Sequence, residues 1–430
     1  MPESPEPERR VLGATGGAAL VVASMVGAGV FGTTGYLAAS LGSGRDILLA
    51  WTLGGVLALC GALCFAELGG MMPEAGAEYR YVRRIFGRRA GFLCGFFSFS
   101  AGFAAPIAGV ALVLGRYLVA MGLPGGAALW GALAILGAAA AQLGGLRWSA
   151  GVNGGLAAAK VALLALFGLA GILVPAARDP EALALAQPGP LSAAFASALV
   201  LVAFAYTGWN AAAYLAGEMR EPGRTLPRAL VLGTAAVTVL YVLVNVAYLR
   251  AAAPAEMAGT AEVGHLAAIR LFGAEVGRFF GVAISLMLVS TILAFTIAGP
   301  RIPLAMAEEG QVPAALGRRD ARGVPRAAVA LQAALALALL PFEPDAILIY
   351  VGMALSLFAG LAVAGVIVMR RREPERPRPF RVPLHPLPAI AFILLAGGMV
   401  VFSAKDRPEP ALATLGTAAV GLALERAFRR

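Results

Sequence analysis

Twelve long apolar stretches divide the 430 residues of this chain, and they constrain its fold more than any single motif does. A helix needs about 20 apolar residues to cross a hydrocarbon core of about 30 Å. Only 13% of the residues are charged and 60% are hydrophobic, whereas a soluble domain carries roughly 25% charged residues. The sequence therefore predicts an all-α polytopic membrane protein, surrounded by lipid over most of its surface.

The stretches lie near residues 14–40, 47–70, 90–120, 127–145, 152–174, 191–216, 228–250, 276–300, 326–341, 344–369, 385–403 and 409–427. The ninth is short, and its boundary with the tenth is the least distinct. The first lacks a clear cleavage site, so we interpret it as a transmembrane helix rather than a signal peptide. No Pro- or Ser-rich linker separates a second domain, and we expect one membrane transport domain over residues 1–430.

The basic residues are distributed unevenly between the segments that join these stretches. If the N-terminus is cytoplasmic, the cytoplasmic segments hold 25 of the 34 arginines and lysines, and the outer segments hold eight. Cytoplasmic loops of membrane proteins carry an excess of Arg and Lys. We therefore expect both termini in the cytoplasm and a multi-pass protein of the cytoplasmic (inner) membrane. The same rule explains the net charge of +10 without a nucleic-acid partner.

Two of the apolar stretches contain glycines near their middle, in Val26-Gly27-Ala28-Gly29-Val30-Phe31-Gly32 and in Phe204-Ala205-Tyr206-Thr207-Gly208-Trp209-Asn210. Each glycine weakens a helix by roughly 1 kcal/mol relative to alanine. The first motif could instead be a face for close helix packing, and the second an ordinary kink with an aromatic cluster. The two motifs occupy the first and sixth stretches, which correspond in two halves of five spans. This arrangement is typical of a transporter site built on inverted repeats.

A break in a membrane helix suggests a ligand. It exposes N–H groups at the start of one half-helix and carbonyl groups at the end of the other. The N–H end favours an anion and the carbonyl end favours a cation. A zwitterionic amino acid carries both a carboxylate and an ammonium group, so two broken helices predict an amino acid site without a charged side chain.

These residues resemble those of the amino acid–polyamine–organocation superfamily, most of all its L-type amino acid transporter branch and bacterial relatives. The resemblance covers residues 14–385 and is carried by the segments Gly27 to Phe31, Ala66 to Tyr79, Phe204 to Asn210 with Glu218 and Leu226 to Arg228, and Pro300 to Gly310. It implies transport by alternating access. It also implies a LeuT-like inverted repeat of five plus five helices, with a first repeat at 14–174, a second at 191–369 and two additional helices at 385–427.

The resemblance also implies a binding site. Backbone groups of Gly27, Ala28, Gly29 and Val30 would hold the substrate carboxylate, and carbonyls near Val26 and from Phe204 through Ala205 to Tyr206 would hold the amine. Phe204 would be an aromatic gate, and Gly208 and Asn210 would belong to the unwound segment. Two positions depart from the family. Ala28 lacks the hydroxyl that is often present there, and Thr207 stands where glycine is common, which argues against large aromatic substrates.

Lys160 lies in the middle of the fifth stretch, and the only other lysine of the chain is Lys405. A charged group in the hydrocarbon region costs roughly 3 kcal/mol or more, so it should face the protein interior. The alternative is a lysine that snorkels to the cytoplasmic edge. The resemblance implies that Lys160 replaces a sodium ion and that transport is proton-coupled or an exchange. Ser290 and Thr291 are candidate partners, although such hydroxyls can also bond to their own helix.

Two acidic residues, Glu67 and Glu218, lie near predicted cytoplasmic helix ends. They could form an inner gate with neighbouring arginines. They could equally be solvated charges at the membrane interface.

Other function classes are less compatible with the sequence. An enzyme would need histidines, cysteines or paired carboxylates inside the spans, and a channel would need polar rings along a pore. No nucleotide-binding loop, disulfide framework, cofactor or metal site is expected. A sensor with a transporter fold stays open.

Several alternatives within transport also stay open. They are sodium symport and a cationic amino acid or polyamine as the substrate. We expect a neutral amino acid, because no carboxylate lies near the breaks. The outward-facing cysteine that some relatives use for a partner subunit is absent, so no obligatory partner subunit is predicted.

Overall fold

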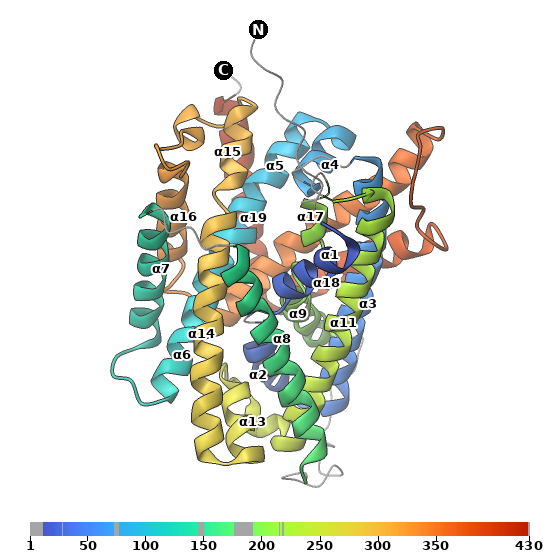
Figure 1. Cartoon of the computed structure of the whole chain (residues 1–430). Coiled ribbons are helices and arrows are strands. Elements are labelled where there is room, and N and C mark those ends of the chain that lie inside the picture. Colours follow the sequence, from blue (N-terminus) through green and yellow to red (C-terminus); the bar gives the residue numbers. More distant parts are fainter. Residues whose placement is uncertain are drawn as a thin grey trace.

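The computed structural model describes residues 12–27, 29–72, 77–144, 150–175, 192–214, 216 and 219–428. Within these ranges the chain is helical and contains no sheet; one isolated bridge pairs Leu12 with Met219. Figure 1 shows long helices running between two ends, with α4, α5 and α15 at one end and α13 at the other. The predicted all-α class is confirmed.

Each of the twelve predicted stretches contains helix. In order, these helices are α1 (Ala14–Met25) with α2 (Gly29–Leu41), α3 (Gly44–Met71), α5 (Arg88–Phe99) continuing through the π-helical turn η1 (Ser100–Ala104) into α6 (Ala105–Ala120), α7 (Ala127–Leu143), α8 (Ala150–Leu173), α9 (Ala193–Ala205) with α10 (Ala211–Tyr214), α11 (Pro222–Ala251), α14 (Ala274–Ala298) with α15 (Arg301–Glu308), α16 (Arg326–Ala338), α17 (Pro344–Arg372), α18 (Leu387–Asp406) and α19 (Pro408–Phe428). In the described part of the chain, seven helices are long and apolar enough to cross a membrane alone, and the bent pair α1–α2 makes an eighth. The helices α7, α9 and α16 are apolar but shorter.

Four short elements lie between these helices. They are α4 (Ala77–Phe86), α12 (Pro254–Met257), α13 (Val263–Phe272) and the 3-10 turn η4 (Ala314–Gly317). The sequence did not predict them, because segments of four to ten residues are too short for the length criterion that identifies a span.

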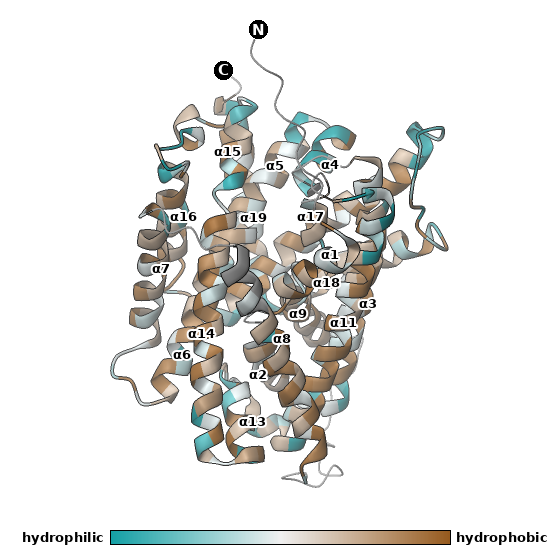
Figure 2. Ribbon diagram, in the orientation of Figure 1, coloured by the Kyte–Doolittle hydropathy of each residue, from teal (hydrophilic) through white to brown (hydrophobic). Residues whose placement is uncertain are grey.

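The outer surface of the bundle is apolar in its middle. On α14, the side chains of Phe279, Val282, Leu286 and Val289 are all exposed. Their spacing of three or four residues places them on one stripe of the helix. Figure 2 shows hydrophobic residues around the middle of the bundle and hydrophilic ones mainly toward its ends. Such a surface fits lipid, because an exposed apolar patch of this extent is not expected on a soluble monomer.

Arginines join several helices at one end of the bundle. Arg83 of α4 forms an ion pair with Glu309, and Tyr79 of the same helix donates a hydrogen bond to Gln311 at 2.9 Å. Arg88, at the start of α5, donates to the carbonyl of Gly310 at 3.2 Å. These contacts fasten α4 and α5 to the end of α15. This end of the bundle carries the arginine-rich segments that the charge distribution assigns to the cytoplasm.

The core is built on close contacts between small residues. A Cβ on Gly55 of α3 would lie 2.2 Å from Thr238 of α11, and one on Gly17 of α1 would lie 2.7 Å from Ala229. No side chain fits at either glycine unless its neighbour moves. Helices in lipid associate through such close packing, and it holds α1 and α3 against α11.

Glu78 of α4 generates a prediction about pH. Its side chain is 4% exposed, and burial raises the pKa of its carboxyl from 4.5 to about 7. Because the folded protein holds this proton more tightly than the unfolded chain does, stability should fall as the pH rises from about 4.5 to about 7 and then level off. The loss is on the order of 3 kcal/mol. We expect Glu78→Gln to remove this component and to be more stable than the wild type above pH 7.

The measurement is the midpoint of thermal denaturation in detergent between pH 4.5 and 8. Glu275→Gln is the matched control, because Glu275 is exposed at the opposite end of the bundle. Parallel pH profiles for the wild type and Glu78→Gln would contradict the prediction.

Candidate functional site

Both glycine-containing motifs interrupt their helices. The helix α1 ends at Met25 and α2 begins at Gly29, with a bend of 45° between them. The helix α9 ends at Ala205, and a turn over residues 206–210 leads into α10. Within this turn Gly208 has φ +101°, a conformation that side chains rarely adopt. Both predicted breaks are therefore present.

The two breaks are in contact with each other. A Cβ on Gly29 would lie 2.4 Å from the Cα of Ala205, and one on Gly208 would lie 2.8 Å from the backbone of Ser24. Each break thus presents a glycine to the backbone of the other. Close packing was the alternative explanation for the first motif. It describes part of what Gly29 does, but the surface on which Gly29 packs is the second break.

Tyr241 of α11 binds both breaks, and the sequence analysis did not identify it. Its hydroxyl is buried and lies 2.6 Å from the carbonyl oxygen of Met25 and 3.2 Å from that of Ala205. These carbonyls end α1 and α9. A hydroxyl has one hydrogen to donate, so the two carbonyls share it. The only sequence signal for this role is a tyrosine inside an apolar helix.

Other hydroxyls bind the backbone around the breaks. Tyr248 donates to the carbonyl of Val30 at 3.4 Å, and Tyr117 donates to that of Phe31 at 3.1 Å. Both carbonyls belong to the first turn of α2, where carbonyls already accept bonds within the helix. The tyrosines add a second bond to each and hold the start of α2 against α6 and α11. The carbonyl of Phe204 accepts both the hydroxyl of Thr207 at 2.7 Å and its N–H at 2.9 Å.

The structure places the predicted binding residues in different surroundings. Gly29, Ala205 and Gly208 lie at the contact between the breaks. Gly27 faces Thr291 of α14, and Val26 and Val30 are buried. Tyr206 and Thr207 face away from it, since both line a cavity toward α3 and α17. Phe204 is 4% exposed, Asn210 is half-buried, and Ala28 lies outside the described residues.

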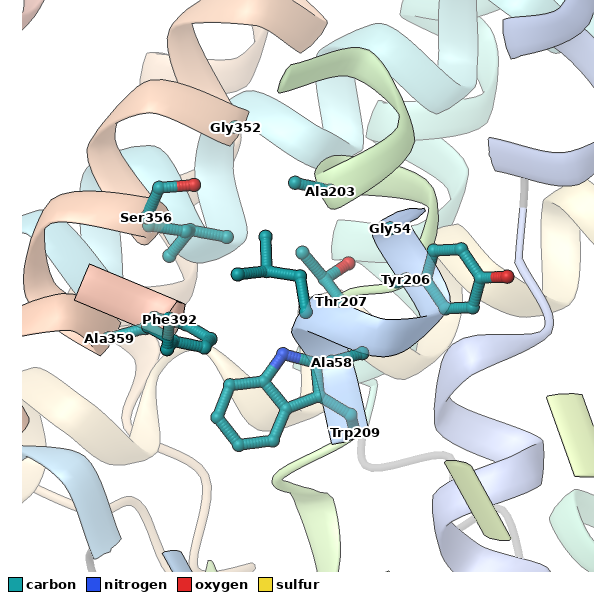
Figure 3. Close-up of a pocket in the computed structure, with 12 residues that line it drawn as sticks. Gly54, Ala58, Ala203, Tyr206, Thr207, Trp209, Gly352, Ser356, Ala359 and Phe392 are labelled. Atoms are coloured by element: carbon teal, nitrogen blue, oxygen red, sulfur yellow. The ribbon is translucent and has the colours of Figure 1, made fainter. Parts of the chain in front are cut away.

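The cavity beside the second break is small. It measures about 40 Å³ and is lined by residues of α3, α9, α17 and α18. Figure 3 shows Thr207, Ser356 and the Trp209 ring around it, with the Tyr206 hydroxyl directed away. That hydroxyl donates to the carbonyl of Trp51 at 3.0 Å. Sites for small molecules usually measure roughly 300–1,000 Å³, so this cavity is below that range. The contact of Gly29 with Ala205 and of Gly208 with Ser24 shows that the breaks in this conformation are closed on each other.

Lys160 of α8 is buried, with 6% of its surface exposed. Its ammonium nitrogen lies 3.0 Å from the hydroxyl of Thr291 on α14. Thr291 also donates to the carbonyl of Met287 at 3.0 Å, so its oxygen is free to accept from the lysine. A Cβ on Gly27 would lie 3.6 Å from the methyl carbon of Thr291. The lysine therefore faces the bundle interior beside the first break. Ser290, the other candidate partner, is also buried.

Glu67 of α3 is fully buried in a network of positive charges. Arg370 binds it through two hydrogen bonds, of 2.8 and 2.6 Å, and Arg378 lies 3.4 Å away. The N–H of Val382 donates to it at 2.7 Å. Glu67 is thus not a solvated interfacial charge: it ties α3 to the end of α17 and to the segment that follows. Glu218, the other candidate gate residue, lies outside the described residues.

Comparison with known sequences identifies the family of this chain. A sequence profile described as amino acid permease matches residues 15–415. The chain belongs to the amino acid permease family. This permease is 28% identical over 413 residues to the large neutral amino acids transporter small subunit 2 of Mus musculus, covering 93% of the chain and 77% of the relative.

Two further relatives match with similar identity. The permease is 29% identical over 392 residues to the serine/threonine exchanger SteT of Bacillus subtilis (89% of the chain, 88% of the relative). It is 29% identical over 418 residues to the b(0,+)-type amino acid transporter 1 of Mus musculus (94% and 84%). All three are named as transporters or exchangers, which supports a transport role rather than an enzymatic one. Together with the apolar helices, they identify the permease as a multi-pass membrane protein.

The contact between the breaks generates a steric prediction. In Gly29→Ala the new methyl group would overlap the backbone of Ala205, and overpacking of this kind costs about 1–3 kcal/mol. We expect the variant to fold but to show a lower thermal midpoint in detergent and at least about tenfold slower amino acid flux. Gly137→Ala on α7 is the control, since a Cβ there meets nothing within 4 Å. Equal behaviour of the two variants would show that the breaks do not pack as described.

Proposed function

We propose that this permease is a sodium-independent secondary transporter of neutral amino acids that works by alternating access. The observation that carries the proposal is the pair of broken helices in contact, next to a buried lysine. Membership of the amino acid permease family supports amino acids as the substrate class.

The breaks supply the chemistry that a zwitterion needs. The N-terminal N–H groups of α2, at Gly29 and Val30, would receive the substrate carboxylate. The carbonyls of Met25 and Ala205 would receive its ammonium group, because a carbonyl oxygen has two lone pairs and can accept a second bond. In the closed conformation the Tyr241 hydroxyl occupies this cation end of the site, and it would share these carbonyls with the substrate or leave them.

The choice of a neutral substrate follows from charge. No aspartate or glutamate occurs in the described helices α1, α2, α9 and α10. A substrate with a cationic side chain would therefore bring an unpaired charge into the membrane interior, which is costly. The names of two relatives, a large neutral amino acids transporter and a serine/threonine exchanger, agree with this choice.

Lys160 would take the place of a sodium ion. Its ammonium group is a fixed positive charge bound to α14 and adjacent to the first break. A fixed charge at this position would remove the need for a bound cation to bridge the first and eighth predicted spans. Transport would then be coupled to protons or to the exchange of a second amino acid.

Alternating access would require the two sides of the site to open in turn. We propose two inverted repeats, at residues 14–174 and 191–369, that move relative to each other, with the helices from 385 to 427 as an addition. The Glu67–Arg370–Arg378 network would close the arginine-rich end. By the positive-inside rule this end, with both termini, would face the cytoplasm, and the membrane would be the cytoplasmic membrane.

The direct test is counterflow in proteoliposomes that contain the purified protein. Serine, leucine, arginine and putrescine would be compared with and without sodium and with an imposed pH gradient. Sodium-insensitive counterflow of a neutral amino acid supports the proposal. A strict requirement for sodium would contradict the proposed role of Lys160, and binding without flux would indicate a sensor.

Lys160 generates a second prediction. Removing a hydrogen bond that involves a charged group costs roughly 1.5–3 kcal/mol, so we expect Lys160→Ala and Thr291→Val to slow flux by at least about tenfold. Lys405→Ala is the matched control, because Lys405 is an exposed lysine at the end of α18. Initial rates of counterflow are the measurement. Unchanged exchange and pH dependence in Lys160→Ala would eliminate the coupling role.

A further inference from the structure

A polar cavity lies at the end of the bundle opposite the arginine-rich end. It measures about 300 Å³ and is lined by Tyr36, Ala39, Ser40, Arg116, Ser197, Leu201, Gly259, Glu343, Asp345, Ile349, Asp406 and Arg407. We call this cavity the outer vestibule. It is several times larger than the cavity beside the second break and reaches the lower limit of the range for small-molecule sites, roughly 300–1,000 Å³.

The outer vestibule lies in line with the two breaks. Tyr36 follows Gly29 by seven residues along α2, and Ser197 precedes Ala205 by eight residues along α9. At a rise of 1.5 Å per residue these positions are about 10–12 Å from the breaks. The helices α2 and α9 are in contact with each other. A solute moving from this end of the bundle toward the breaks along these helices would therefore pass the vestibule.

Charged groups of both signs line the vestibule. Arg116 of α6 lies 3.0 Å from Glu343, and Arg407 lies 3.1 Å from Asp345. Asp406 is also at its edge. The two guanidinium groups are partly exposed, at 31% and 43%. Exposed ion pairs contribute little to stability, with a median of about 0–1 kcal/mol, so their members can exchange partners for a ligand.

Tyr36 places a buried hydroxyl without a described partner at the outer vestibule. Its side chain is 7% exposed, and among the described residues its hydroxyl has no hydrogen-bond partner. Buried polar groups are nearly always hydrogen-bonded, and this one lines the vestibule beside Arg116 and Asp345. A hydroxyl donor and guanidinium groups together suit a carboxylate, and the nearby acidic groups suit an ammonium.

We propose that the outer vestibule is a second amino acid site, which receives a zwitterion before it reaches the breaks. The Tyr36 hydroxyl and a guanidinium group, that of Arg116 or Arg407, bind the carboxylate, and Asp345 binds the ammonium group. The lining carries two arginines and three acidic residues, a net charge of −1 that disfavours acidic amino acids. The site rests on the proposed transport function, and it adds selection at the outer surface.

The test is Tyr36→Phe, which removes the hydroxyl and keeps the ring. Because the hydroxyl has no partner among the described residues, we expect the variant to fold normally. The KM for a neutral amino acid would be measured from the outer and the inner face of oriented proteoliposomes. We expect the outer KM to rise about tenfold, as for the loss of one hydrogen bond to a charged group, while the inner KM and the maximal rate stay unchanged.

Tyr350→Phe is the matched control, since that hydroxyl contacts Thr417 at 3.0 Å and does not line the vestibule. An unchanged outer KM in Tyr36→Phe would overturn the proposal and would indicate that water satisfies the hydroxyl. Asp345→Asn is a second variant. It should raise the outer KM for neutral amino acids and allow external glutamate to inhibit; if neither change occurs, the charge selection is refuted.

Equilibrium binding separates this proposal from the transport function. Radiolabelled serine or leucine would be bound to the purified full-length protein, as wild type and as Tyr36→Phe. Binding that depends on Tyr36 without any flux would retain the vestibule and refute transport. If Tyr36→Phe shows flux with the same outer KM and the same inner KM as the wild type, the transport function would be retained and the vestibule site would be refuted. Absence of both binding and flux would refute both.

Discussion

The arrangement of the whole bundle depends on the contact between its two interrupted helices. Lipid provides no hydrogen bonds, so a break inside a membrane is tolerated only where protein satisfies the exposed backbone groups. Here the hydroxyl of Tyr241 satisfies the carbonyls that end α1 and α9. It reaches both because the breaks pack together, Gly29 on Ala205 and Gly208 on Ser24. The long helices α3 and α11 hold this contact in place, because small residues let them approach the half-helices closely.

Charged side chains connect helices inside the bundle and at both of its ends. Lys160 connects α8 to α14 beside the first break, and Glu67 connects α3 to the end of α17. Both are buried, and breaking a buried charge pair by removing one partner costs far more than breaking an exposed one. The charged pairs at the other end, around Arg116 and Arg407, are partly exposed. The charged contacts at the arginine-rich end are therefore the more costly to break.

Much of this architecture could be predicted from the sequence, because the signals are local. Apolar length identified a helix in every predicted stretch, and glycines within two of them located both breaks. The short elements α4, α12 and α13 were missed, since they are too brief for a length criterion. Tyr241 was missed for a different reason: its hydroxyl meets a carbonyl 216 positions away in the chain, and no local pattern encodes that contact. The partners of Glu67 lie just over 300 residues away, so its burial was equally inaccessible. The roles proposed for the residues at the breaks stay predictions.

The shared hydroxyl of Tyr241 has a consequence for the transport cycle. A carrier that can close only around its cargo must exchange one molecule for another, because the empty form is trapped on one side. In this structure the carbonyls that end α1 and α9 are satisfied by the protein's own side chain, so the closed form leaves these acceptors neither exposed nor unpaired. In the proposed cycle, the return of the empty carrier would therefore not carry the cost of unpaired acceptors at these positions. A carrier that returns empty can catalyse net flux as well as exchange, and a coupled proton gradient would then drive accumulation.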